Sequence, residues 1–128
     1  MKNLTKIEII KETVEFYSED INRRSASDSN GCRYNGDNGT HCAFGRCMLP
    51  KYQEQGEKLL SNDWKIETML ENNKIIFHDD VLQEKYRGHE ISFWNKIQTF
   101  HDTDRFWGVN RLTSSGVLEF KKLNNLYI

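Results

Sequence analysis

The sequence predicts an α+β fold in a single domain spanning residues 1–128, with one β-hairpin, a possible third strand and about five helices. Several segments repeat apolar residues at the spacing of an amphipathic helix. One Asn- and Gly-rich turn separates two short runs of strand-forming residues, which is typical of a hairpin. The length of 128 residues suits one hydrophobic core and is too short for two comfortable domains.

The first predicted helix covers residues 4–21. Thr5 and Glu8 form a T-x-x-E capping box, in which each side chain accepts a hydrogen bond from the backbone N–H of the other residue. The polar residues 22–31 that follow are predicted to form a loop. The expected apolar face of this helix consists of Ile7, Ile10, Val14, Tyr17 and Ile21.

A β-hairpin is predicted over residues 32–44. Its turn reads Asn-Gly-Asp-Asn-Gly, and these residue types tolerate the positive φ angles that tight hairpin turns require. Gly45 is expected to break the second strand. Pro50 then suits the first turn of a helix over residues 50–61, or a bend.

Residues 62–73 are predicted to form a short helix, and residues 74–78 a strand or a buried extended segment. The next helix, over residues 90–101, places a hydrophobic stripe against the core and His101 beside it. The stripe consists of Phe93, Trp94, Ile97 and Phe100.

The C-terminal region is predicted to contain two more helices. Asp102 or Thr103 caps the first, which runs through Leu112 and stops at Gly116. Residues 117–128 form the last helix.

Charge and composition exclude several classes of protein. The net charge is −1, so no general basic field is present to hold nucleic acid. No run approaches 18 apolar residues, so no membrane span is expected. The first residues lack the apolar core of a signal peptide, and three cysteines are an odd number for a disulfide framework. We therefore expect a protein of a reducing cytoplasm.

Several short motifs are spread along the chain. They are Cys32-Arg33-Tyr34, Cys42-Ala43-Phe44-Gly45 and Gln98-Thr99-Phe100-His101-Asp102, together with Tyr52, Gly56, Trp107, Leu112 and Gly116. This set of motifs resembles a group of small phage and prophage proteins. The resemblance covers roughly residues 23–117, with Ile97 where a leucine is expected and an additional residue before Leu49. It implies a phage or mobile-element setting, and hence a host cytoplasm, more than a mechanism.

One candidate site is a thiol centre with Cys42 as nucleophile, His101 as base and Asp102 as orienting carboxylate. A nearby imidazole lowers the pKa of a thiol and so activates it. Adjacent helical side chains diverge by about 100°, so Asp102 is expected to orient His101 poorly. Asp104 or Asn110 would then substitute. The alternative is that Cys42 is a small buried hydrophobe.

A metal site is the second candidate. Cys32, His41, Cys42, Cys47 and His101 are ligands that zinc accepts, but the spacing C-x9-C-x4-C is not a zinc-knuckle spacing. Neighbouring strand residues also point to opposite faces of a sheet. We therefore expect no metal and no cofactor.

The favoured interpretation is a small binding or inhibitor protein that acts stoichiometrically in host takeover or counter-defence. Arg33, Tyr34, His41 and Arg46 place cationic and aromatic groups around the glycine-rich loop, where they suit a host protein or a small anionic ligand. The simpler alternative is that the arginines are solvated and Tyr34 is part of the core. The alternative function is a thiol-dependent hydrolase or transferase using Cys42 and His101.

Overall fold

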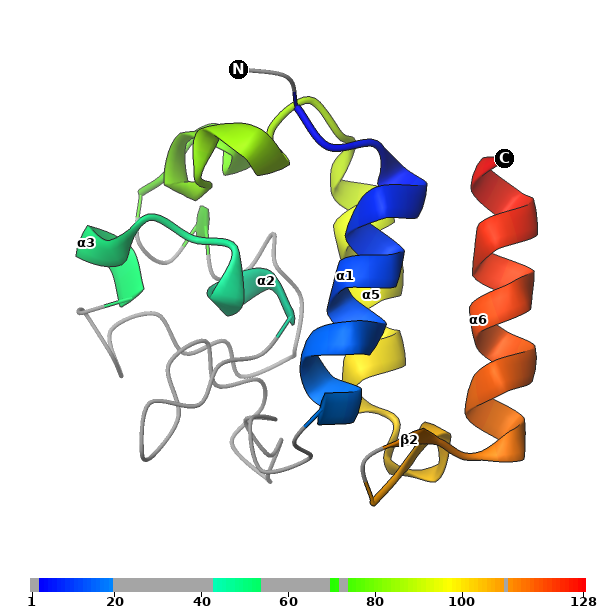
Figure 1. Ribbon diagram of the computed structural model, residues 1–128. Coiled ribbons are helices and arrows are strands. Elements are labelled where there is room, and N and C mark those ends of the chain that lie inside the picture. The colour runs from blue at the N-terminus through cyan, green and yellow to red at the C-terminus, as the bar shows by residue number, and fades with distance from the viewer. Residues whose placement is uncertain (1–2, 20–42, 54–69, 72–73, 110) are drawn as a thin grey trace.

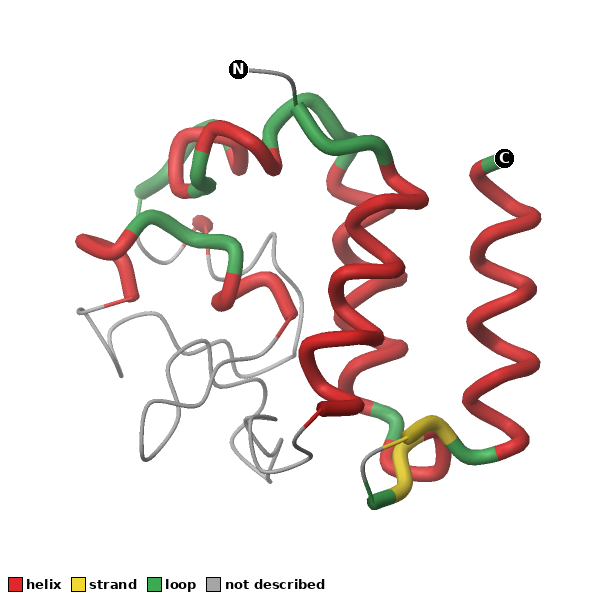
Figure 2. The backbone as a smooth tube through the Cα atoms, viewed as in Figure 1, coloured by secondary structure: helices red, strands yellow, loops and turns green. Residues whose placement is uncertain are grey.

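The computed structural model describes residues 3–19, 43–53, 70–71, 74–109 and 111–128 (Figure 1). Helices dominate the described chain, and the single sheet is a two-stranded antiparallel ribbon (Figure 2). The α+β class is confirmed at this level. The predictions of about five helices and of a third strand are not confirmed. No helix in the described ranges combines the length and the apolar character needed to cross a membrane.

Helix α1 (Lys6–Glu19) begins at the predicted capping box. The Thr5 N–H donates to Oε1 of Glu8 over 2.9 Å, and the Glu8 N–H donates to Oγ1 of Thr5 over 3.2 Å. The predicted helix is therefore confirmed at its start. Its buried face turns slightly from the predicted one and consists of Ile9, Ile10, Thr13 and Tyr17.

Helices α2 (Ala43–Arg46) and α3 (Pro50–Gln53) are short. Pro50 opens α3, as predicted. The hairpin prediction is wrong at its C-terminal end, because Ala43 and Phe44 are helical and Gly45 continues that helix. The Phe44 N–H donates to Oε1 of Gln98 over 3.0 Å, a long-range contact that holds this turn in place. Residues 32–42 of the predicted hairpin lie outside the described residues.

The chain after α2 pairs with a distant segment. Met48 and Leu82 form an isolated antiparallel bridge. The Leu49 N–H donates to the Val81 carbonyl, and the Gln83 N–H donates to the Cys47 carbonyl. These bonds connect residues 47–49 to the turns η4 (His78–Val81) and η5 (Glu84–Tyr86).

The predicted strand or buried segment at residues 74–78 is wrong. Ile76 is 98% exposed and Phe77 is 54% exposed. Lys74 has a φ of 57°, and the Ile75 N–H donates back to the Leu70 carbonyl instead of to a neighbouring strand. Of the predicted helix over residues 62–73, the structure describes only Leu70 and Glu71, which are helical.

Helix α5 (Ile91–Asp102) confirms the predicted hydrophobic stripe, since all four of its residues are buried. The fully buried ring of Trp94 lies at the centre of the stripe and meets Phe44, Tyr86 and Phe93 edge to face. Gln98 and His101 are buried on the same helix.

The predicted helix from Thr103 through Leu112 is wrong. One 3₁₀ turn, η6 (Asp104–Phe106), leads into strands β1 (Trp107–Gly108) and β2 (Arg111–Leu112), which pair antiparallel. The long helix α6 (Ser114–Tyr127) follows and confirms the predicted last helix, although it begins three residues earlier.

Gly116 starts a helix rather than stopping one. Its N–H donates to Oγ1 of Thr113, the N-cap residue of α6, over 3.1 Å. The Thr113 hydroxyl in turn donates to the Arg105 carbonyl over 2.5 Å. A Cβ atom at position 116 would collide with the carbonyl oxygen of Phe106, so this close approach of two backbones requires glycine.

Helices α1, α5 and α6 stand side by side, with α2, α3, η4 and η5 at one side of them (Figure 1). Helix α1 contacts both α6 and β2, and α2 packs on α5. The buried apolar side chains of these elements form one cluster. The core thus joins the first and last described helices across about 100 residues of sequence.

Candidate functional site

His101 and Asp102 form a hydrogen-bonded pair at the C-terminal end of α5. The distance from Nδ1 of His101 to Oδ1 of Asp102 is 2.8 Å, and the imidazole is fully buried. The expectation that Asp102 orients His101 poorly is therefore wrong. Asp102 is the last residue of the helix, so no following helical turn prevents its side chain from folding toward the imidazole.

The aromatic ring of Tyr17 packs against this imidazole. The ring centroids of Tyr17 and His101 are 4.7 Å apart at an interplanar angle of 70°. Tyr17 also meets Trp107 edge to face, and the indole N–H of Trp107 donates to the Phe100 carbonyl over 3.1 Å. The carboxylate favours the neutral tautomer that carries its proton on Nδ1. That tautomer has its lone pair on Nε2, as general-base histidines do.

The start of α2 packs against α5, the helix that carries this pair. The hydrogen bond from Phe44 reaches Gln98, which is one turn before His101 on α5. Cys42 immediately precedes α2 in the sequence and lies outside the described residues. Of the predicted thiol centre, the structure describes His101 and Asp102 and brings them together.

Of the four predicted ligand-binding residues, the structure describes only Arg46. Its side chain is 10% exposed, so the expectation of an exposed arginine is wrong at this position. Nη1 of Arg46 donates to Oε1 of Glu12 over 2.7 Å and to the Tyr86 hydroxyl over 3.2 Å. Nη2 donates to Oγ1 of Thr13 over 3.4 Å. Arg33, Tyr34 and His41 lie outside the described residues.

The charges around Arg46 stabilise one another. Burial opposes the charged guanidinium, but Cys47 and Glu12 raise the pKa of Arg46 above its usual value. Burial would raise the pKa of Glu12, yet the hydrogen bonds from Tyr86 and Arg46 outweigh it and lower that pKa. Burial, Cys47 and the hydrogen bond to Glu12 raise the pKa of the Tyr86 hydroxyl. The cluster is therefore an internal tie between α1, α2 and η5.

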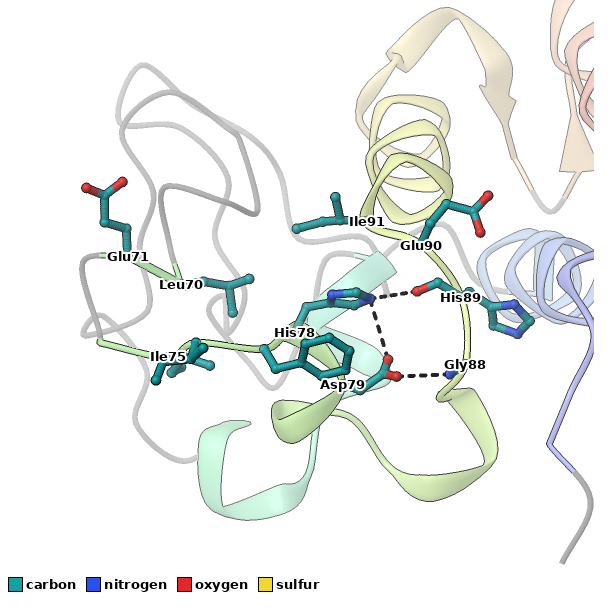
Figure 3. A pocket seen from close by; sticks show the side chains of 11 residues that line it. Leu70, Glu71, Ile75, His78, Asp79, Gly88, His89, Glu90 and Ile91 are labelled. Atoms are coloured by element: carbon teal, nitrogen blue, oxygen red, sulfur yellow. Dashed lines mark hydrogen bonds and ion pairs between the residues drawn. The ribbon is translucent and has the colours of Figure 1, made fainter.

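A pocket of about 780 Å³ is lined by residues 70–71, 75–79 and 88–91 (Figure 3). Most of its surface is apolar, and its apolar lining residues are Leu70, Ile75, Ile76, Phe77 and Ile91.

A polar network fixes the wall of this pocket (Figure 3). Nε2 of His78 lies 2.6 Å from the His89 carbonyl and 3.5 Å from Oδ1 of Asp79. Oδ2 of Asp79 accepts from the Gly88 N–H over 3.1 Å. Gly88 has a φ of 98°, a conformation that favours glycine. His78 and Asp79 thus hold the pocket wall against residues 88–89.

Sequence reasoning missed this pocket, because it assigned residues 74–78 to the interior. The available signal was an apolar run, Ile75 to Phe77, without a period of two and without a partner strand. In the described part of the chain, no three His, Cys, Asp or Glu side chains gather closely enough to hold a metal ion.

Comparisons with protein-family models, curated proteins and solved structures find no match to this chain.

Proposed function

We propose that this chain is a small binding or inhibitor protein of a phage or mobile element, which acts stoichiometrically on a host protein in host takeover or counter-defence. The observation that carries the proposal is the apolar lip of the pocket, where Ile76 is 98% exposed and Phe77 is 54% exposed. Exposed apolar side chains beside an open apolar pocket are typical of interaction sites.

The chemistry of the pocket favours binding over catalysis. Both polar groups that resemble catalytic residues, His78 and Asp79, bond to the backbone of residues 88–89 and hold the wall. Glu71 and Glu90 line the pocket, and no described lysine or arginine does. This pocket therefore suits an apolar side chain of a protein partner better than a small anion.

The experiment compares two substitutions that each introduce a carboxylate at an exposed apolar residue. Tagged protein is incubated with host lysate, and the molar ratio of captured partner is measured by native mass spectrometry. Ile76→Asp should lower the affinity by about tenfold or more, because it places a carboxylate on the apolar lip. Val109→Asp is the matched control, since Val109 is 79% exposed on the turn between β1 and β2. The proposal fails if both variants capture the partner equally. It also fails if the protein produces its biological effect at less than one molar equivalent of the partner.

The second candidate function is a thiol-dependent hydrolase or transferase. The observation that favours it is the bond between His101 and Asp102, one helical turn from the contact that docks the start of α2. In this mechanism, the Cys42 sulfur attacks an acyl carbon while His101 takes the thiol proton. His101 then returns the proton to the leaving group.

Iodoacetamide labelling tests this second function. Cys42 should react faster at pH 7 than Cys32 and Cys47, and Asp102→Asn should slow its labelling, because the imidazole loses its orienting carboxylate. Equal and slow labelling of all three cysteines would remove the thiol mechanism.

A further inference from the structure

A second concave surface lies on another part of the molecule, between α5 and α6. It is a groove of about 580 Å³. Its first wall includes Lys96 and Thr99 of α5 and the C-cap residue Thr103, at positions i, i+3 and i+7. Its α6 wall has the same spacing, so the groove follows both helix axes.

The floor of the groove is apolar, and its rim carries an excess of positive charge. The floor includes Phe100, Phe106 and Leu123, and Leu126 is a half-exposed part of the α6 wall. The rim has three cations, Lys96, Arg105 and Lys122, and one carboxylate, that of Glu119. Within the described residues, none of the three cations forms an ion pair.

The length of the groove matches a short helix. From Ser92 to Thr103, the α5 wall extends for about 16 Å at the helical rise of 1.5 Å per residue. About three turns of a partner helix have this length. An apolar stripe on such a helix would meet the floor, and acidic residues beside the stripe would meet the cations of the rim.

We propose that the groove between α5 and α6 binds an acidic amphipathic helix of a partner protein. The cations are spread along the groove, since Lys96 lies within α5 and Arg105 lies in η6 beyond its end. A fatty acid, whose single carboxylate needs its cations at one end, fits this distribution less well. The groove shares no lining residue with the pocket at Ile76, so it is a site of its own.

The test uses the full chain and a fluorescent synthetic peptide of about 14 residues, with leucine at every third or fourth position and glutamate between them. A control peptide carries lysine in place of glutamate. We expect the glutamate peptide to bind and the lysine peptide to bind at least about tenfold more weakly, with an affinity that falls as salt is added.

Charge reversals on the groove complete the test. Lys96→Glu and Lys122→Glu should each weaken binding of the glutamate peptide by about tenfold. Lys121→Glu is the matched control, because it makes the same charge change at an exposed position of α6 outside the groove. Circular dichroism checks that each variant is folded, and amide shifts of Thr99 and Leu126 on peptide addition report the location.

Three outcomes would overturn the groove proposal. These are the absence of binding by the glutamate peptide, equal binding of both peptides, and an equal effect of Lys121→Glu and Lys96→Glu. If the groove proposal fails while Ile76→Asp still abolishes partner capture, the stoichiometric binding function stands without the groove.

Discussion

Replacing Arg46 by methionine removes the cation that joins α1, α2 and η5. The methionine side chain retains much of the apolar stem and loses the guanidinium contacts to Glu12, Tyr86 and Thr13. It also loses the position of the guanidinium over the ring of Phe16, 5.2 Å from the ring centroid. The variant therefore tests whether this arginine supports the fold instead of contacting a ligand.

The expected loss in the free energy of unfolding follows from the burial of the two charged partners, Arg46 and Glu12. Breaking a buried ion pair costs about 3–5 kcal/mol, and a hydrogen bond to a charged group contributes about 1.5–3 kcal/mol. Arg46 is 10% exposed, but Glu12 is 33% exposed, and solvent screens its charge. We therefore expect a loss of about 3 kcal/mol in the free energy of unfolding. In a chain of 128 residues this loss lowers the Tm by about 11 °C.

The assay is urea unfolding of four proteins: the parent, Arg46→Met, Glu12→Gln and the double variant. We expect a coupling free energy of about 1–3 kcal/mol between the two positions, because each substitution removes the same interaction. Arg111→Met is the control, since Arg111 is exposed on β2 and its loss should cost less than about 0.5 kcal/mol. If Arg46→Met is as mild as Arg111→Met, or if the two positions do not couple, the cluster is not a structural tie.

Three further predictions concern stability. Trp94→Ala should cost about 3–5 kcal/mol in calorimetry, because it empties a fully buried site, and a parental Tm would contradict this. Gly116→Ala should destabilise by about 1–3 kcal/mol, because its methyl group meets the Phe106 carbonyl, whereas an end-of-helix glycine would tolerate alanine with a much smaller loss. The pKa of Glu12 is lower in the folded state, so its contribution is present above the unfolded pKa of about 4.3 and is lost as the pH falls below it. The stability gap between the parent and Glu12→Gln should therefore shrink from pH 6 to pH 3 in urea titrations, and a constant gap would show that Glu12 titrates normally.

Local signals in the sequence predicted the parts of the fold that depend on neighbouring residues. The Thr5–Glu8 capping box and the stripe around Trp94 are complete within a few residues, and both are confirmed. The helix predicted to begin at Asp102 or Thr103 begins instead after Thr113, whose hydroxyl oxygen accepts from the Gly116 N–H. Gly116 was misassigned because the carbonyl that excludes a side chain there belongs to Phe106, ten residues earlier.

The candidate sites likewise combine local features, which the sequence predicts, with long-range geometry, which it does not. The pairing of His101 with Asp102 was available from sequence as a motif, but its geometry depends on where α5 ends. The pocket at Ile76 and the groove beside Lys96 arise only when segments from different parts of the chain come together. Periodicity alone assigns an apolar residue such as Ile76 to the interior, because it does not show whether a partner surface exists.

The contact between α1 and α6 has a consequence for the order of folding. Helix α6 contacts η6 and β2, and Phe100 of α5 packs on Phe106 and Trp107. These contacts span short sequence separations, so the segment from α5 to α6 closes with little loss of chain entropy. Docking α1 onto α6 closes a loop of nearly the whole chain, which costs more chain entropy than the short-range contacts, so we expect it to form later. We therefore expect pulse-labelling hydrogen exchange during refolding to protect the amides of α5 and α6 before those of α1, and the reverse order would show that α1 nucleates the fold.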